Sequence, residues 1–105
     1  MSFTCIPGAA AKQMMESREV TIIDIRDPSS FAAAHVTGAI SVNNTNVNEF
    51  VAQADFEKPL LVFCYHGHSS QGAADFFGNQ GFAEVYSVDG GFEEWRVAYP
   101  TDQTS

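Results

Sequence analysis

The strongest constraint on the fold is a strand–loop–helix pattern within residues 59–81. Leu60–Phe63 is a run of four apolar residues directly after Pro59, which is typical of a short buried strand. The residues after position 72 have the spacing of a helix with one apolar face, made by Ala73, Phe76, Phe77 and Gln80. A strand joined in this way to a helix is the repeating unit of parallel sheets that are covered by helices.

The same alternation of strand and helix occurs five times along the chain. Strands are predicted over residues 3–6, 20–25, 39–42, 60–63 and 84–88. Helices are predicted over residues 8–17, from 28 to near 35, after 46, from 69 or 70 to 80, and after the glycine pair 90–91. We therefore expect one α/β domain over residues 1–105, a five-stranded parallel sheet with helices on both faces. The polar tail from about residue 100 is expected to be frayed.

Helix starts are marked by side chains that can cap them. Asp27 followed by Pro28 is typical of a cap and a first helical position. Asn46 with Glu49 three residues later resembles a capping box. Ser69 or Ser70 is expected to cap the helix after the loop that follows residue 63.

The charge balance restricts the partners of the chain. The net charge is −8, with only five Lys and Arg residues, whereas nucleic acids and anionic membranes require clustered cations. No apolar run approaches the roughly 20 residues that span a bilayer. The start of the chain lacks the basic and apolar segments of a secretory signal, so a cytoplasmic location is expected.

The chain has two cysteines, Cys5 and Cys64. In a reducing cytoplasm both are expected to be free thiols, with Cys5 a small buried hydrophobic residue. The three His and two Cys residues lack zinc-ligand spacing, so no metal is predicted, and no cofactor is indicated.

Cys64 lies where a reactive cysteine is expected. It ends a buried strand and faces the start of a helix, the place where ligands of open α/β sheets bind. The helix dipole and free amide groups there stabilise a negative charge, so the pKa of Cys64 should be lowered. The backbone N–H groups of residues 65–70 could surround an anionic sulfur, with Gly67 in a left-handed conformation and the hydroxyls of Ser69 or Ser70 as further donors. We refer to residues 64–70 as the Cys64 loop.

Four stretches together resemble the rhodanese family. They are residues 24–27, Phe31 with residues 35–40, residues 64–69 and residues 89–95, in the order of the family and over nearly the whole chain. The resemblance implies a cysteine, here Cys64, that carries sulfur as a persulfide. It implies a reaction of thiosulfate with cyanide that gives sulfite and thiocyanate, with thioredoxin or another thiol as a physiological acceptor. Tyr65, His66, Gly67, His68, Ser69 and Ser70 would form the binding loop, and Asp24, Arg26 and His35 would support it.

The Cys64 loop differs from the corresponding loop of phosphatase-like enzymes. Phosphatases and arsenate reductases that resemble rhodaneses have a loop one residue longer, which ends in an oxyanion-binding arginine. Here Ser70, Gln71 and Gly72 follow, so a phosphate ester would lack its bidentate partner. A phosphatase-like hydrolase and a non-catalytic sulfur-sensing module are the competing hypotheses.

The Cys64 loop departs from the commoner rhodanese pattern at Tyr65 and His68, where many members have basic residues. We therefore expect weak affinity for thiosulfate, with a cation count that depends on the protonation of His66 and His68. Each of these histidines is either a substrate contact or a solvent-exposed bystander, and Tyr65 either leans over the site or packs sideways.

Other polar and aromatic residues have simpler interpretations. Asp24, Arg26 and Asp27 are expected to form an ion-pair and capping group, with Arg26 as a substrate contact the less favoured role. His35 is expected to bond the chain near the turn at Thr37-Gly38. Phe92 and Trp95 are expected to close the core.

Overall fold

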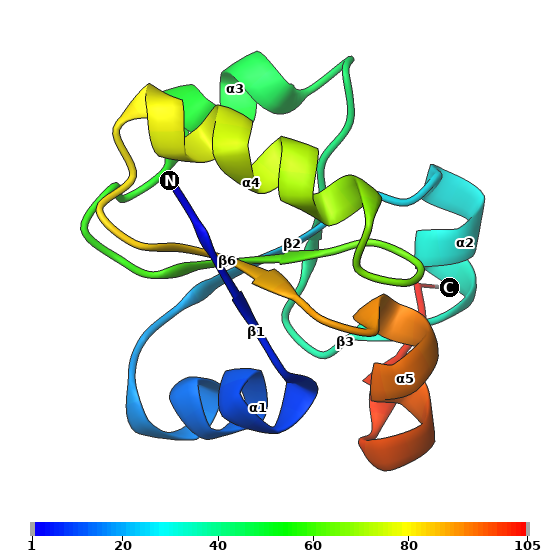
Figure 1. Ribbon diagram of the computed structural model, residues 1–105. Coiled ribbons are helices and arrows are strands. Elements are labelled where there is room, and N and C mark those ends of the chain that lie inside the picture. The colour runs from blue at the N-terminus through cyan, green and yellow to red at the C-terminus, as the bar shows by residue number, and fades with distance from the viewer. Residues whose placement is uncertain (1, 105) are drawn as a thin grey trace.

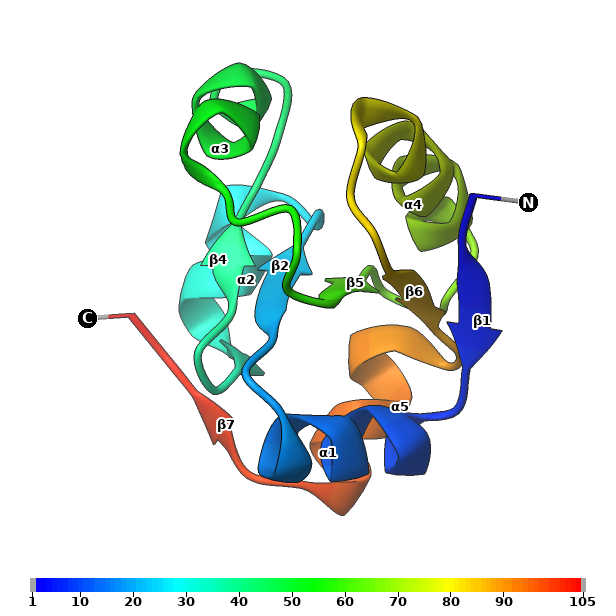
Figure 2. The ribbon, with the colours of Figure 1, turned by 90° about the vertical axis from the view of Figure 1, so that its left-hand side faces the viewer.

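The computed structural model describes residues 2–104 and has a five-stranded parallel sheet at its centre (Figure 1). The strand order is β1-β6-β5-β2-β4, which leaves β1 and β4 at the two edges (Figure 2). The strands are β1 (Thr4–Ile6), β2 (Thr21–Asp24), β4 (Ile40–Ser41), β5 (Leu60–Phe63) and β6 (Val85–Val88). The parallel sheet confirms the fold class predicted from the alternation of strands and helices.

Helices cover both faces of this sheet, as expected. In Figure 1, α3 and α4 lie above the sheet, α1 and α5 lie below it, and α2 lies beside its carboxyl edge. The helices are α1 (Gly8–Ser17), α2 (Pro28–Ala33), α3 (Val47–Gln53), α4 (Ser69–Gln80) and α5 (Gly91–Ala98). Within residues 2–104, no helix is both long and apolar enough to cross a bilayer.

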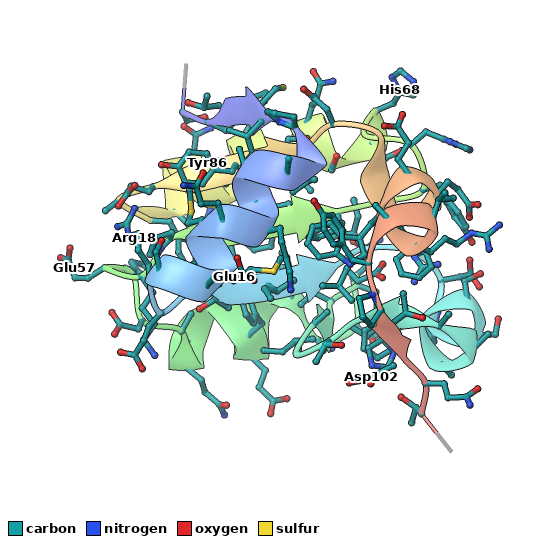
Figure 3. The ribbon with its side chains drawn as sticks, turned by 90° about the horizontal axis from the view of Figure 1, so that it is seen from below. Glu16, Arg18, Glu57, His68, Tyr86 and Asp102 are labelled. Carbon is teal, nitrogen blue, oxygen red and sulfur yellow. The ribbon has the colours of Figure 1, made fainter. Side chains whose placement is uncertain are left out.

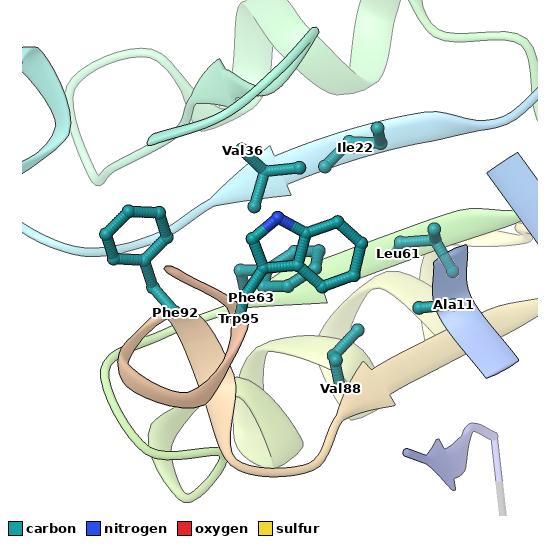
Figure 4. Close-up of a cluster of buried hydrophobic side chains, with 8 residues drawn as sticks. All are labelled: Ala11, Ile22, Val36, Leu61, Phe63, Val88, Phe92 and Trp95. Carbon is teal, nitrogen blue, oxygen red and sulfur yellow. The ribbon is translucent and has the colours of Figure 1, made fainter. Parts of the chain in front are cut away.

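The central strand β5 divides its side chains between two cores, which explains its unbroken apolar sequence. Leu61 and Phe63 belong to the cluster between the sheet and helices α1 and α5. Leu60 and Val62 belong to the cluster between the sheet and helices α3 and α4. In the first cluster the ring of Trp95 meets Phe63 edge to face at a centroid distance of 5.2 Å (Figure 4). Phe92 and Trp95 are therefore core residues, as predicted.

The predicted caps are correct at one helix and wrong at two. The Asp27 carboxylate accepts a hydrogen bond from the Ser30 amide and caps α2. Asn46 precedes α3 without capping it, because its side chain instead accepts from the Asn43 amide and donates to the Ser41 carbonyl. His68 is the residue that precedes α4, so Ser69 and Ser70 do not cap that helix; they lie within it.

The expectation of a frayed tail is wrong for residues 101–104. Thr101–Asp102 forms β7, which pairs antiparallel with β3 (His35–Val36), and the Thr104 amide donates to the Ala32 carbonyl at 2.9 Å. Backbone hydrogen bonds hold this segment, while the side chains of Thr101 and Asp102 are exposed. A polar composition therefore gave no indication of the pairing.

Two predictions of burial are also wrong. Cys5 is exposed, because β1 is a short edge strand whose first two residues face solvent. Phe76 is 43 % exposed, and the buried face of α4 consists instead of Ser70, Ala74 and Phe77. The i, i+4, i+7 spacing of these three residues is the helical repeat, and it places a serine in the core face.

Candidate active site

Cys64 directly follows β5, at the carboxyl edge of the sheet. β2 lies on one side of β5 and β6 on the other, and α4 begins at Ser69. The cysteine is 4 % exposed, so its surroundings rather than bulk water determine its ionisation. This is the position in an open parallel sheet where ligands collect.

Backbone amides of the Cys64 loop point at the cysteine sulfur. The amides of Gly67 and Ser70 donate to Sγ at 3.1 and 3.3 Å, and the Ser70 hydroxyl lies 3.2 Å from it. Gly67 has a φ of 90°, the left-handed conformation predicted for it. The loop therefore forms a concave anion-binding site around the sulfur.

These contacts favour the thiolate. Burial raises the pKa of the Cys64 thiol, because it penalises the charged form. Hydrogen bonds from the Ser70 hydroxyl and from the amides of Ser70, Gly67 and His66 outweigh that effect. The pKa of Cys64 consequently lies below its ordinary value, which makes the residue a better nucleophile near neutral pH.

The start of α5 explains why the loop amides face inward. The amide of Phe92 donates to the Cys64 carbonyl at 2.8 Å, and the amide of Glu93 donates to the Tyr65 carbonyl at 3.0 Å. In a trans peptide unit the C=O and N–H bonds point in opposite directions. Anchoring the Tyr65 carbonyl to α5 therefore turns the His66 amide toward the sulfur.

Glycine is needed where α5 meets the loop. A Cβ atom on Gly91 would lie 2.5 Å from the Cys64 carbonyl oxygen and 2.6 Å from the Tyr65 carbonyl carbon. A Cβ atom on Gly67 would lie 3.0 Å from the Gly90 amide nitrogen. Gly91 and Gly67 thus permit backbone-to-backbone contacts that any larger residue would push apart.

Tyr65 packs sideways over α2. Its hydroxyl donates to the Asp27 carboxylate and lies 2.7 Å from the Ser30 hydroxyl. The Tyr65 hydroxyl, together with the donors of α2, holds the pKa of Asp27 well below its usual range. This arrangement connects the first residue after Cys64 to the cap of α2.

Asp24 and Arg26 form a buried ion pair beside the loop. Arg26 Nη2 lies 2.7 Å from Asp24 Oδ2 and also donates to the Ala34 carbonyl at 2.7 Å. The guanidinium stacks on the Phe92 ring, with 4.1 Å from Cζ to the ring centroid. Arg26 is 5 % exposed and its Nε and Nη2 groups are engaged by the protein, which is the arrangement of a supporting residue.

His35 lies on β3 and contacts Phe31 of α2. Its Nδ1 is 2.7 Å from the Phe31 carbonyl oxygen, and its ring stacks on the Phe31 ring at 4.0 Å between centroids. The predicted contact with the turn at Thr37-Gly38 is not the one observed; His35 instead bonds the end of α2. Its neighbour Val36 is also part of β3.

The structure brings only part of the predicted loop to the sulfur. Within residues 2–104, the side chains of His66, His68 and Ser69 make no hydrogen bond to Sγ, and all three residues are exposed. His68 extends outward from the molecular surface (Figure 3). These side chains are free to meet a ligand that arrives from solvent.

Sequence reasoning missed two contributors to the site. Gln71 donates from Nε2 to the Gly67 carbonyl at 3.0 Å and braces the loop. Ser87, on β6, lies 2.8 Å from the Ser70 hydroxyl and is fully buried. A serine inside an otherwise apolar strand is the signal that could have revealed it, because a buried hydroxyl needs a partner.

Comparisons with known proteins agree with one another. The sequence model of the Rhodanese-like domain family matches residues 8–98. Thiosulfate sulfurtransferase GlpE of Stutzerimonas stutzeri is 53 % identical over 100 residues, covering 95 % of this chain and 91 % of the relative. The protein of the same name from Vibrio cholerae is 55 % identical over 96 residues, covering 91 % of each chain.

Solved structures share the fold at lower identity. A rhodanese-like domain protein from Staphylococcus aureus has a TM-score of 0.84 at 18 % identity and covers 98 % of this chain and 100 % of its own. The Alr3790 protein of Anabaena has a TM-score of 0.83 at 22 % identity, covering 94 % and 92 % of the two chains.

Proposed function

Because this chain belongs to the rhodanese-like domain family, we propose that it is a thiosulfate sulfurtransferase in which Cys64 carries the transferred sulfur as a persulfide. The proposal has support from the relatives over nearly the full length, which are named for this activity. The observation that carries the role of Cys64 is the pair of amides, from Gly67 and Ser70, that donate to its sulfur.

In the first half-reaction the Cys64 thiolate attacks the outer sulfur of thiosulfate. A new S–S bond forms to Sγ, the S–S bond of thiosulfate breaks, and sulfite leaves with the electron pair of that bond. The lowered pKa of Cys64 favours the thiolate that this attack requires. The product is a persulfide on Cys64.

In the second half-reaction an acceptor nucleophile attacks the outer sulfur of the persulfide. With cyanide the product is thiocyanate, and with a thiol it is a new persulfide on that thiol. In both cases the Cys64 thiolate is the leaving group and is ready for another cycle, which is a ping-pong scheme. Inward-facing loop amides stabilise that leaving thiolate as well as the persulfide anion.

The residues around the loop disfavour phosphate-ester hydrolysis. Arg26, the cation beside the loop, is 5 % exposed and bound to Asp24. The first turn of α4 holds Ser70, Gln71 and Gly72, with no arginine. A doubly charged phosphate would therefore lack a bidentate guanidinium partner.

We propose a thiol as the acceptor beside cyanide, either thioredoxin or another thiol. Cys5 and Cys64 are both free thiols, which supports action in a reducing compartment such as the cytoplasm.

Intact mass spectrometry after incubation with thiosulfate tests the proposal. We expect the protein to gain one sulfur atom and to lose it on addition of cyanide, with thiocyanate released. Cys5→Ser is the matched control and should keep the gain, because Cys5 lies exposed on edge strand β1 and its thiol makes no hydrogen bond to any other part of residues 2–104.

Two results would contradict the proposal. A gain of sulfur that persists in Cys64→Ser would place the persulfide on another residue. A stable gain that cyanide and thiols cannot remove would indicate a sulfur-binding module without turnover.

A further inference from the structure

Ser87 is the second member of a buried hydroxyl chain that ends at the cysteine sulfur. Its Oγ lies 2.8 Å from Ser70 Oγ, which lies 3.2 Å from Cys64 Sγ. Ser70 and Ser87 are both fully buried. Ser87 pairs with Val62 of β5 on one side and with Cys5 of β1 on the other, so the sheet fixes its position.

The hydrogen bonds that link Ser87, Ser70 and the Cys64 sulfur have a preferred direction. Each hydroxyl has one hydrogen to donate. When Cys64 is a thiolate, Ser87 donates to Ser70 and Ser70 donates to Sγ, so both hydrogens are used. When Cys64 is a thiol that donates to Ser70, the Ser70 hydroxyl must donate to Ser87. The Ser87 hydroxyl then has no further acceptor within residues 2–104. A buried donor without an acceptor is unfavourable.

We infer that Ser87 is a positioning residue that holds the Ser70 hydroxyl as a donor to the anionic sulfur of Cys64. Ser87 touches neither sulfur nor substrate; it acts through Ser70. This inference rests on the proposed function in one respect, that Cys64 is the nucleophile. It adds that a residue of β6, outside the loop and α4, sets how acidic the nucleophile is.

The charged and titratable side chains around Cys64 do not take the place of the Ser70 hydroxyl as donor to the sulfur. They lie in the loop itself, on the β2–α2 side and at the start of α5: Tyr65, His66 and His68; Asp24, Arg26 and Asp27; Asp89, Glu93 and Glu94. Among the described residues, none of their side chains hydrogen-bonds to Sγ. The side-chain donor to the sulfur is therefore the Ser70 hydroxyl, which Ser87 orients.

The test is the pKa of Cys64 in the free protein. The rate of alkylation by iodoacetamide is measured from pH 5 to 10 on the peptide that contains Cys64, so that the exposed Cys5 does not contribute. We expect Ser87→Ala to move the midpoint upward by about half a pKa unit, about a three-fold decrease in thiolate at a pH below the midpoint. An unchanged midpoint would overturn the inference.

Ser41→Ala is the matched control. Its hydroxyl is buried on β4 of the same sheet and has no hydrogen-bond partner within residues 2–104, so its removal should leave the midpoint unchanged. A midpoint that moves equally in Ser41→Ala would show a general effect of the substitution on the sheet and would also overturn the inference.

A double-mutant cycle tests the route through Ser70. In a Ser70→Ala background, Ser87→Ala should have no further effect on the midpoint, because its intermediary is gone. An equal shift in both backgrounds would contradict the route. If Ser87→Ala does not fold, Ser87→Thr and Ser87→Val replace it, since they have similar shapes and only the first retains a hydroxyl.

These measurements need neither thiosulfate nor an acceptor. A protein that fails to gain sulfur but shows the Ser87 shift would refute the proposed reaction and leave the inference standing. A protein that gains sulfur but shows no change of the alkylation midpoint in Ser87→Ala would support the proposed reaction and refute the inference.

Discussion

Replacing Gly91 with alanine should damage the joint between α5 and the Cys64 loop. Gly91 has a φ of 57°, a left-handed conformation, and it begins α5. The added Cβ would meet backbone atoms of Cys64 and Tyr65 at 2.5 to 2.6 Å, too close for any carbon. Because the neighbours are backbone rather than flexible side chains, the loop or the helix must shift.

Two contributions give the expected magnitude. An alanine in the left-handed region costs about 1–2 kcal/mol relative to glycine. Relieving an overpacked contact in a closely packed region costs about a further 1–3 kcal/mol. Gly91→Ala should thus lower the free energy of unfolding by about 2–5 kcal/mol, a large part of the roughly 5–15 kcal/mol of a typical domain.

Two other glycines provide controls for the separate contributions. Gly38 has a φ of 86° but nothing within 4 Å of an added Cβ, so Gly38→Ala measures the conformational cost alone. Gly72 lies in α4 with ordinary φ and open space, so Gly72→Ala should raise stability by about 0.5–1 kcal/mol.

Urea denaturation of the three variants, with the alkylation midpoint of Cys64 as a second measurement, tests this reasoning. Gly91→Ala should also raise the pKa of Cys64, because the peptide units that α5 anchors no longer point their amides at the sulfur. A Gly91→Ala variant no less stable than Gly38→Ala would refute the proposed contact between backbones.

Three further outcomes follow from the surroundings of the loop. Tyr65→Phe removes the donor that contributes most to the low pKa of Asp27. A depressed carboxyl pKa gives stability that is present above the unfolded value of about 3.9 and is lost as the pH falls through the folded value. The decrease in the urea midpoint from pH 7 to about pH 2.5 should therefore be smaller in this variant than in the wild type. Arg26→Gln leaves Asp24 buried without its partner and should cost about 3–5 kcal/mol in urea denaturation; a loss below about 1 kcal/mol would mean that water replaces the guanidinium. His68→Arg adds a permanent cation within the Cys64 loop and should lower the apparent KM for thiosulfate by up to about five-fold, equivalent to about 1 kcal/mol. An unchanged KM in steady-state assays would contradict electrostatic capture of the donor.

The sequence was sufficient where short-range pattern and burial agree. The helix predicted over residues 8–17 and the strand predicted over residues 60–63 have those bounds in the structure. Asp27-Pro28 correctly marked a helix start because capping is a local interaction between neighbouring residues. The loop after β5 was recognisable because glycine and small polar residues separate two strongly apolar segments.

Other features depend on partners that are distant in the sequence. The pairing of β3 with β7 joins two two-residue strands through backbone groups alone, so no side-chain pattern reveals it. Phe76 looks like a core residue by composition, yet the register of α4 on the sheet turns it outward. Ser87 became part of the site only when β6 and α4 were placed against each other, because its link to the site is a hydroxyl of α4.

The anchoring of the loop by α5 also affects when the cysteine becomes reactive during synthesis. During synthesis Cys64 is added before Phe92 and Glu93, whose amides donate to the carbonyls of Cys64 and Tyr65. Until those residues are made, the carbonyls of Cys64 and Tyr65 lack the α5 donors that turn the loop amides toward the sulfur. A chain that lacks α5 should therefore carry a Cys64 thiol whose pKa lies closer to its ordinary value.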